Sequence, residues 1–400
     1  MTVWDQVPLR RLFRIVNGGT PTSDLENWDG DVPWATPVDL GLYNGSIVTS
    51  TQRTLTEQGL SSGSAAVPGG SLLLSTRAPI GYVAQTISPI AFNQGCRGLI
   101  PLRPLDIRFY KYVLCSMGER LQASGQGSTF VELSSDTLAS AVLPLVSIEA
   151  QGEIADFLDT ETARIDALIS KKRELIARLT EHRAGRIELA IRGLAATWSE
   201  VPLKFVVAAV TVGIVVTPAA WYAEDGIPAL RGVNVKPGEI LTDDIVHLSE
   251  EGHALHQKSA LHAGDLVVVR TGQAGVAAVI PPNLDGANCI DLLIIRPGEQ
   301  IVPEFLEFVL NSDWTLKHIE QNSVGTIQSH FNVASMKNLP VPSAPLEEQS
   351  TAVRYLTVMT KVIDKTVDKL NRQLLLLQEH RQALISAAVS GEHVIPKAAA

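Results

Sequence analysis

The feature that most constrains this chain is a segment of about 45 residues that occurs twice. Both copies place apolar residues at helical spacing, contain no proline and end at a glycine, as expected of long amphipathic helices. The pattern predicts two matching long helices. Residues 149–193 and 347–391 align without a gap at an offset of 198 positions, with the identities Glu149/Glu347, Gln151/Gln349, Thr162/Thr360, Ile165/Ile363 and Gly193/Gly391.

Each helical copy follows a globular segment, and the two globular segments also repeat. The second segment matches the first at offsets of 194 to 198, but only at predicted strands, glycines and prolines. This difference indicates one architecture that carries two different surfaces. The repeated elements are Trp4-x-x-Val-Pro-Leu with Trp198-x-x-Val-Pro-Leu, and GSLLLSTRAPIGYVA from Gly70 with GDLVVVRTGQAGVAA from Gly264.

Composition places the chain among soluble multidomain proteins. Its 400 residues, 45% of them hydrophobic, allow two to three domains with real cores. No apolar run is long enough for a membrane span and the N-terminus lacks a secretory core, so a cytoplasmic location is expected. The three cysteines have no short paired spacing and are expected to be buried apolar residues.

The net charge of −9 is concentrated in the second globular segment, where residues 199–346 carry 8 Lys+Arg against 16 Asp+Glu. A protein that grips a polyanion unaided normally shows a basic face. The balance therefore argues against strong solitary binding of nucleic acid, and leaves room for a partner that supplies positive charge.

Helices of this length need a packing partner. A helix of 45 residues is roughly 65 Å long, and its apolar seam must be covered. The twin helix is the available cover, most simply in an antiparallel pair that spaces the globular units along a rod with approximate two-fold symmetry. The predicted fold class is α+β: two mixed α/β domains (1–146 and 197–344), two long helices (147–196 and 345–392) and a tail (393–400).

The duplicated order of these elements resembles the specificity subunit of Type I restriction-modification systems. The resemblance rests on W-x-x-VPL, the G-x-TP turn, the I/VP strand, the PLEEQ string at 345–349 and the long helix. It implies two target recognition domains that read a bipartite, asymmetric site in double-stranded DNA. It also implies that two modification (methyltransferase) subunits dock on the helices, and that restriction subunits join the full complex.

The framework match nominates loops at strand ends for base readout, where arginine suits guanine and amides suit adenine. Arg77 and Arg270 stand out, because each lies in a glycine-containing turn after an apolar strand; solvated or ion-paired surface arginines are the alternative. In the first domain the candidates are Thr36, Asp39, Thr76, Arg77, Asn93, Gln94, Ser128 and Thr129, and in the second they are Arg231, Asn234, Arg270, Thr271, Gln273, Asn288, Gln328 and His330.

The repeated Glu-His-Arg run is expected to serve packing or subunit docking, because it lies on both long helices. Its members are Glu181, His182, Arg183, Glu379, His380 and Arg381. The chain shows neither the N/D-P-P-Y/F run expected of an amino-methyltransferase of this system nor a nucleotide-binding motif. A non-catalytic subunit without cofactor or metal is expected.

Two alternatives stay open. The chain could be a duplicated coiled-coil scaffold whose globular domains bind protein, or a recognition module that serves a fused restriction-methylation enzyme. A rod model makes a distinct prediction: one heptad inserted after Lys172 should change the preferred spacer and leave the half-sites alone.

Overall fold

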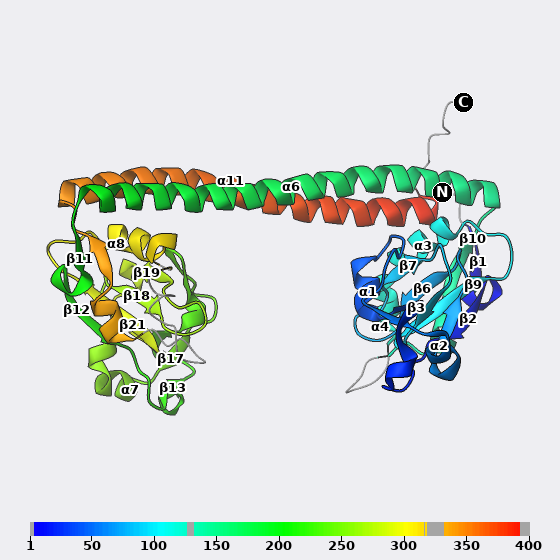
Figure 1. The fold of residues 1–400 in the computed structure, drawn as a ribbon, viewed down its shortest axis with the longest axis horizontal. Helices are drawn as coiled ribbons and strands as arrows, with labels where there is room; N and C mark the ends of the chain where they lie inside the picture. Colours follow the sequence, from blue (N-terminus) through cyan, green and yellow to red (C-terminus); the bar gives the residue numbers. More distant parts are fainter. Residues whose placement is uncertain (1–3, 126–131, 316, 318–331, 393–400) are drawn as a thin grey trace. The chain divides into compact units, whose positions relative to one another are not determined.

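A computed structural model describes residues 4–125, 132–315, 317 and 332–392. The chain divides into two compact units, here unit 1 (Met1–Lys172 with Arg372–Ala400) and unit 2 (Arg173–Asn371). Each unit holds one mixed α/β domain and a part of each long helix, α6 (Ile148–Thr197) and α11 (Leu346–Ser390), as Figure 1 shows. The predicted fold class, two α/β domains joined by two long helices, is confirmed.

The domain of unit 1 contains two four-stranded sheets, ordered β2-β9-β6-β7 and β4-β3-β8-β5, and the small antiparallel pair β1-β10. Five short helices surround the sheets. The strands are β1 (Asp5–Pro8), β2 (Phe13–Asn17), β3 (Trp28–Ala35), β4 (Arg53–Leu55), β5 (Ala65–Val67), β6 (Leu72–Ser75), β7 (Val83–Gln85), β8 (Ile90–Phe92), β9 (Cys96–Pro101) and β10 (Val142–Leu145). The helices are α1 (Pro37–Leu42), α2 (Glu57–Gly63), α3 (Ile107–Ser116), α4 (Gly118–Ala123) and α5 (Ser135–Ser140).

The domain of unit 2 repeats this plan with the sheets β12-β21-β18-β19 and β13-β17-β14-β20 and the pairs β11-β22 and β15-β16. Its strands are β11 (Glu200–Pro202), β12 (Val207–Val212), β13 (Tyr222–Ala223), β14 (Ile227–Leu230), β15 (Val235–Lys236), β16 (Glu239–Ile240), β17 (Val246–Leu248), β18 (Leu266–Val269), β19 (Ala277–Val279), β20 (Asn288–Cys289), β21 (Leu292–Pro297) and β22 (Pro340–Pro342). Its helices are α7 (Glu250–Leu255), α8 (Pro303–Leu310) and α10 (Val333–Lys337).

The central strands β6 and β18 explain why the repeated apolar runs are so visible in the sequence. All four residues of each strand are buried, because both faces of each strand are covered. Leu72 and Leu74 lie in one buried cluster and Leu73 in another, and Leu266 and Val268 are separated from Val267 and Val269 in the same way. The turns that follow them share a positive-φ glycine, Gly81 at 95° and Gly275 at 96°. Each glycine N–H donates to the last carbonyl of its strand, Ser75 at 3.0 Å and Val269 at 2.9 Å. The two turns are therefore copies of one backbone design.

Within unit 1, α6 and α11 run antiparallel. Arg381 Nε lies 2.9 Å from Asp166 Oδ1, and Lys172 Nζ donates to Gln373 Oε1 at 2.7 Å. The partner number on α11 falls as the number on α6 rises, which defines the direction.

Unit 2 contains the same contact in its second copy. Arg183 Nε lies 2.8 Å from Asp364 Oδ1, and Arg186 donates to the hydroxyl of Tyr355. Asp364 and Arg183 are the positions that match Asp166 and Arg381, so one ion pair occurs once in each unit.

The long helices are built into the core of each domain. In unit 1, Leu158 of α6 and Ile385 of α11 belong to the same buried cluster as Phe109 and Val113 of α3. In unit 2 the matching positions Leu356 and Ile187 pack with α8 in the same way. Burying these residues stabilises each helix through the domain it carries, since the propensity of an isolated helix contributes little.

A buried glutamine fastens each domain to its helix. Gln151, 2% exposed, accepts from the backbone N–H of Asp106 at 2.9 Å and donates to the carbonyl of Val146 at 2.8 Å. Gln349, 1% exposed, accepts from Val302 N at 2.8 Å and donates to Ala344 O at 2.7 Å. The Gln349 amide also donates to Gln300 O at 3.0 Å. Both side chains are satisfied by backbone groups.

Replacing Gln349 by alanine should loosen the second domain from its helix. The change removes the partner of the half-buried Val302 N–H and of two carbonyls, of which that of Ala344 is buried, and this costs roughly 1–3 kcal/mol. Amide hydrogen exchange at Val302 should rise by at least tenfold. The control is Gln382→Ala, an exposed site on the same helix. Unchanged exchange at Val302 would contradict the fastening role.

Burial also accounts for two of the three cysteines. Cys96 and Cys289 lie inside the domains, and burial raises the pKa of both thiols. Each is therefore a protonated, apolar core residue at neutral pH, as expected from the sequence. Among the described residues, no helix has the length and hydropathy that crossing a membrane requires.

Candidate nucleic-acid interface

In the first domain the loops that follow three strands meet at one place. Strands β3 and β8 are parallel, so their C-terminal ends lie side by side, with Ala35 opposite Phe92. Just beyond them, Asn93 N donates to Ala35 O at 2.9 Å, and Thr76 N, after β6, donates to Gly95 O at 2.8 Å. The predicted contacts Thr36, Arg77, Asn93 and Gln94 therefore come from loops that share one edge of the domain.

Gly95 lies where these loops come closest. A Cβ atom at this position would lie 3.1 Å from Pro37 Cγ, 3.2 Å from Asn93 Oδ1 and 3.6 Å from Arg77 Cδ. The first two separations are tighter than ordinary van der Waals contact. A side chain at this position would press on Pro37 and Asn93, so a glycine favours the close approach of the three loops.

Arg77 is the most accessible charged group of this cluster. Its side chain is 48% exposed, and its Nε lies 3.2 Å from Glu132 Oε2. The other oxygen of Glu132 lies 3.3 Å from an amino group of Arg97, whose side chain is 11% exposed. Arg97 Nε in turn donates to Ser135 Oγ at 3.0 Å. Two arginines share the Glu132 carboxylate, so these three side chains together carry one positive charge, which suits guanine or phosphate.

The neighbouring amides are arranged for hydrogen bonding. Gln94 is exposed, and its amide oxygen accepts from the hydroxyl of Thr20. Asn93 is half-buried and accepts from Gly95 N at 2.9 Å. Gln94 is consequently the more accessible of the two predicted amides.

Two predicted contacts of the first domain have structural roles instead. Asp39 is 1% exposed and forms a capping box at the start of α1, accepting from Thr36 N at 2.9 Å and Gln52 N at 2.9 Å. Thr76 is fully buried, with its hydroxyl donating to Gly95 O at 3.2 Å. Neither side chain can reach a base edge in this conformation, because the domain itself covers it. Thr36, the cap residue, is half-buried.

In the second domain, arginines follow the two strands that match β3 and β6 of the first domain. Strands β14 and β20 are parallel, with Leu230 opposite Cys289. Arg231 follows β14, Arg270 follows β18, and Asp291 follows β20. Arg270 NH1 donates to Asp291 Oδ1 at 2.6 Å, and its side chain is 18% exposed. Arg231 donates to Asp244 Oδ2 at 2.8 Å.

These pairings make the second surface different in charge from the first. Arg270 and Arg231 each face their own carboxylate, whereas Arg77 and Arg97 share one. DNA would have to compete with Asp291 and Asp244 for the guanidinium groups. Thr271 and Gln273, in the turn around Gly272, are exposed and lie beside Arg270 in sequence.

Two predicted amides of the second domain are framework residues. Asn234 is 1% exposed and donates to the carbonyls of Leu241 at 3.2 Å and Asp244 at 3.1 Å. Asn288 is fully buried, donates to Ser259 Oγ at 2.8 Å and is hydrogen-bonded to His253. Both amides have their partners inside the domain, which corrects the expectation that they face a base.

Four further candidates, Ser128, Thr129, Gln328 and His330, lie outside the described residues. Sequence reasoning missed Arg97, Glu132 and Asp291. Arg97 opens an apolar strand, which suggested a framework role, and no local signal links Glu132 to either arginine.

The repeated Glu-His-Arg run divides into two kinds of residue. Arg183 and Arg381 form the ion pairs between α6 and α11 described above, so they contribute to helix packing. Glu181, His182, Glu379 and His380 are exposed on the helices. A docking role for these four stays a prediction.

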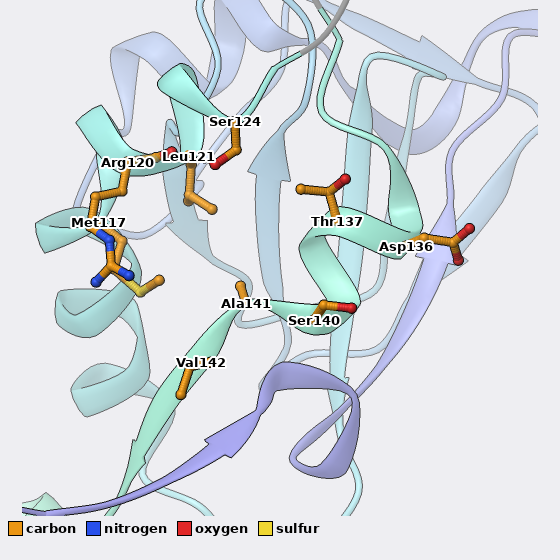
Figure 2. Close-up of a pocket in the computed structure, with 9 residues that line it drawn as sticks. All are labelled: Met117, Arg120, Leu121, Ser124, Asp136, Thr137, Ser140, Ala141 and Val142. Carbon is orange, nitrogen blue, oxygen red and sulfur yellow. Dashed lines mark hydrogen bonds between the residues drawn. The ribbon is translucent and has the colours of Figure 1, made fainter.

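A separate cavity of about 570 Å³ lies in unit 1 between α4, α5 and the start of β10 (Figure 2). Its charged lining residues, Arg120 and Asp136, lie on opposite sides and point away from each other. The hollow between them is lined by Leu121, Ala141 and short hydroxyl side chains.

Within the part of the chain that the structure describes, no group of three or more His, Cys, Asp or Glu side chains is arranged to hold a metal ion.

Comparison with known proteins connects this geometry to one family. Residues 1–178 match the model of the Type I restriction modification DNA specificity domain. The MjaIX specificity subunit of Methanocaldococcus jannaschii is 35% identical over 175 residues, which are 43% of this chain and 40% of that protein. The EcoBI specificity subunit of Escherichia coli is 23% identical over an alignment that covers 97% of this chain and 80% of that protein.

A solved structure shares the whole fold. It was described in work on complex assembly and conformational transition of the type I R-M system, and it aligns with 98% of this chain and 99% of its own length. The TM-score is 0.69 at 17% sequence identity. At this identity the similarity concerns the architecture, and it extends over both domains and both long helices.

Proposed function

Because this chain belongs to the family of Type I restriction-modification specificity subunits, we propose that it selects the DNA sequence on which such a complex acts. The recognition domains, residues 1–146 and 197–344, each read one half of a bipartite, asymmetric site. The long helices dock the modification subunits, two of them per chain, and restriction subunits join through the same core.

The observation that carries this proposal is the reuse of one loop framework with different side chains. Both domains bring an arginine to the end of a buried strand, β6 or β18, beside the ends of a parallel strand pair. The first surface carries Arg77 and Gln94, and the second carries Arg270 and Gln273. Equal frameworks with unequal side chains suit the reading of two unlike half-sites.

A docking role for the helices is supported by their exposed side chains, because both helices carry exposed residues that do not take part in the contacts between α6 and α11. Large apolar side chains, among them Leu375 at 57% and Val358 at 66% exposure, lie on α11 away from the domain cores. Exposed apolar side chains on paired helices suit the addition of further helices from partner subunits.

We assign no catalytic step to this chain. The modification subunits would carry the methyl transfer and most of the phosphate contacts, which fits the net charge of −9. The isolated chain should accordingly bind DNA weakly, and the binding should strengthen once modification subunits are present.

Co-expression with the modification subunit of its own system tests the proposal. Genome-wide mapping of methylated adenines should return a bipartite motif of two unlike half-sites around an unread spacer. Expression of the modification subunit alone is the control and should leave this motif unmethylated. If the chain adds no motif, a scaffold with protein-binding domains becomes the better account.

A further inference from the structure

Unit 2 carries an apolar groove on its paired helices. The groove has a volume of about 560 Å³, and its floor and wall come from Tyr355, Val358, Met359 and Val362 of α11. Val358 is 66% exposed and Val362 is 62% exposed. On an exposed helix face such residues are costly to leave in water, so their clustering marks a contact surface.

The edge of the groove is basic. His182 and Arg354 line it, and the described lining includes no acidic side chain. Arg186 lies beside it, with its guanidinium 5.6 Å from the ring centre of Tyr355. An apolar strip with a basic edge is complementary to a helix that has an apolar face and acidic flanks.

The matching face of unit 1 has different chemistry. Thr160 and Arg164 stand where unit 2 has Val358 and Val362, and Glu161 stands where unit 2 has Met359. Arg164 lies 4.0 Å from Glu161, so this face is occupied by an ion pair. The substituted positions 160, 164, 358 and 362 are exposed, whereas three neighbouring buried positions are identical in the two copies: Leu158 and Leu356, Thr162 and Thr360, and Ile165 and Ile363.

A second substitution strengthens the contrast at the groove edge. Asp156 stands where unit 2 has Arg354, and its carboxylate accepts from Arg108 of the first domain at 2.7 Å. In unit 1 this position therefore binds the helix to its own domain. In unit 2, the hydrogen bond that the described residues give Arg354 is a local one, to Thr351 at 3.0 Å. At this position unit 1 has an acidic side chain that is paired with Arg108, whereas unit 2 has a basic one.

We propose that the two modification subunits are bound unequally: the groove of unit 2 is the tighter seat and receives an apolar, acidic-flanked helix of the first subunit. This inference rests on the docking role proposed above. Two copies of one partner present the same surface to two faces of different chemistry, so their affinities must differ. Assembly then passes through an intermediate with one modification subunit, bound at unit 2.

Titration of the full chain with the modification subunit, followed by native mass spectrometry, tests the order. The natural chain should show two steps whose dissociation constants differ by at least tenfold. The variant Val358→Thr/Val362→Arg carries the unit 1 residues and should weaken the first step at least tenfold. Its matched counterpart, Thr160→Val/Arg164→Val, should tighten the second step and bring the two steps together. All four positions are exposed on helices, and circular dichroism checks that each variant keeps its helix content.

The outcomes separate this inference from the docking role itself. Two equal steps that neither variant changes would overturn unequal seating and leave docking intact. Failure of the natural chain to bind any modification subunit would instead overturn the proposed function. If the Val358→Thr/Val362→Arg variant loads both modification subunits normally but loses a restriction subunit, the groove has a different occupant and the proposal is wrong.

Discussion

Replacing Arg77 by alanine should relax selection at one half-site and leave the other unchanged. The Arg77 side chain is 48% exposed, its Nε lies 3.2 Å from Glu132 Oε2, and its two terminal amino groups are the ones that would contact guanine. A bidentate contact from these groups to guanine contributes about 1–3 kcal/mol of discrimination. Methylation rates on DNA libraries randomised in each half-site should show a tenfold to hundredfold loss of preference at one position only.

We expect the Arg77→Ala variant to remain folded, so that a loss of preference reports on DNA contacts and not on stability. Glu132 keeps Arg97 as its partner when Arg77 is removed, and an exposed ion pair contributes less than about 1 kcal/mol. Arg120→Ala is the matched control, because it removes the same charge from an exposed site on α4 of the same domain. It should leave the preference intact.

A uniform loss would identify a different contact. If Arg77→Ala weakens binding equally for every sequence and lowers the salt slope by about one, Arg77 contacts a phosphate. The guanine assignment would then be wrong, although the location of the surface would stand.

Arg270 needs a different design because it is less exposed and is tied to Asp291. Removing Arg270 alone leaves that carboxylate without its 2.6 Å partner, on a residue whose own backbone lies in the left-handed region at φ 51°. The pair Arg270→Ala/Asp291→Asn avoids the orphaned charge. Comparison of the double variant with Asp291→Asn should then show a change of preference confined to the second half-site.

Lengthening both long helices should change the distance between the half-sites that are read. One heptad inserted after Lys172 in α6 and one after Asn371 in α11 add about 10 Å to each helix. About three base pairs of DNA have this length. The preferred spacer should grow by about three base pairs with both half-sites unchanged, and the rate on the original spacer should fall at least tenfold. Methylome mapping of the variant measures both.

The antiparallel pairing of α6 and α11 explains why both insertions are needed. Lys172 donates to Gln373 across the antiparallel helices, and the two units divide beside these residues. Matched insertions at this boundary keep the pair Arg381–Asp166 within unit 1 and Arg183–Asp364 within unit 2. An insertion in α6 alone would break the register of one pair and serves as the comparison. An unchanged spacer in the matched variant would contradict the rod model.

The fold was predictable because the repeat shows twice which residues are structural. Several positions that agree at the offset of 198 are buried, such as Gln151 with Gln349, or pair the helices, such as Arg183 with Arg381. The apolar runs at β6 and β18 are strands because each is enclosed by neighbours on both sides. The duplicated pattern therefore contained the helices, the central strands and the fold class.

The candidate surface was less predictable, because strand ends supply both exposed and buried polar residues. Asn288 and Gln94 both follow the expected pattern, yet only Gln94 is exposed. The structural role of Asp39 was visible in the sequence, because Thr36-Pro37-Val38-Asp39 has the spacing of a capping box with proline in the first turn. The link from Glu132 to Arg97 depends on the tertiary fold, and no local pattern encodes it.

The glutamines that fasten the domains have an evolutionary consequence. Gln151 and Gln349 bond only to main-chain N–H and carbonyl groups of their domains. Every residue type except proline offers those groups, so almost any substitution in the attached loops preserves the joint. The side chains of the recognition loops can therefore change without altering how each glutamine holds its domain, so new specificities can arise on the same pair of helices.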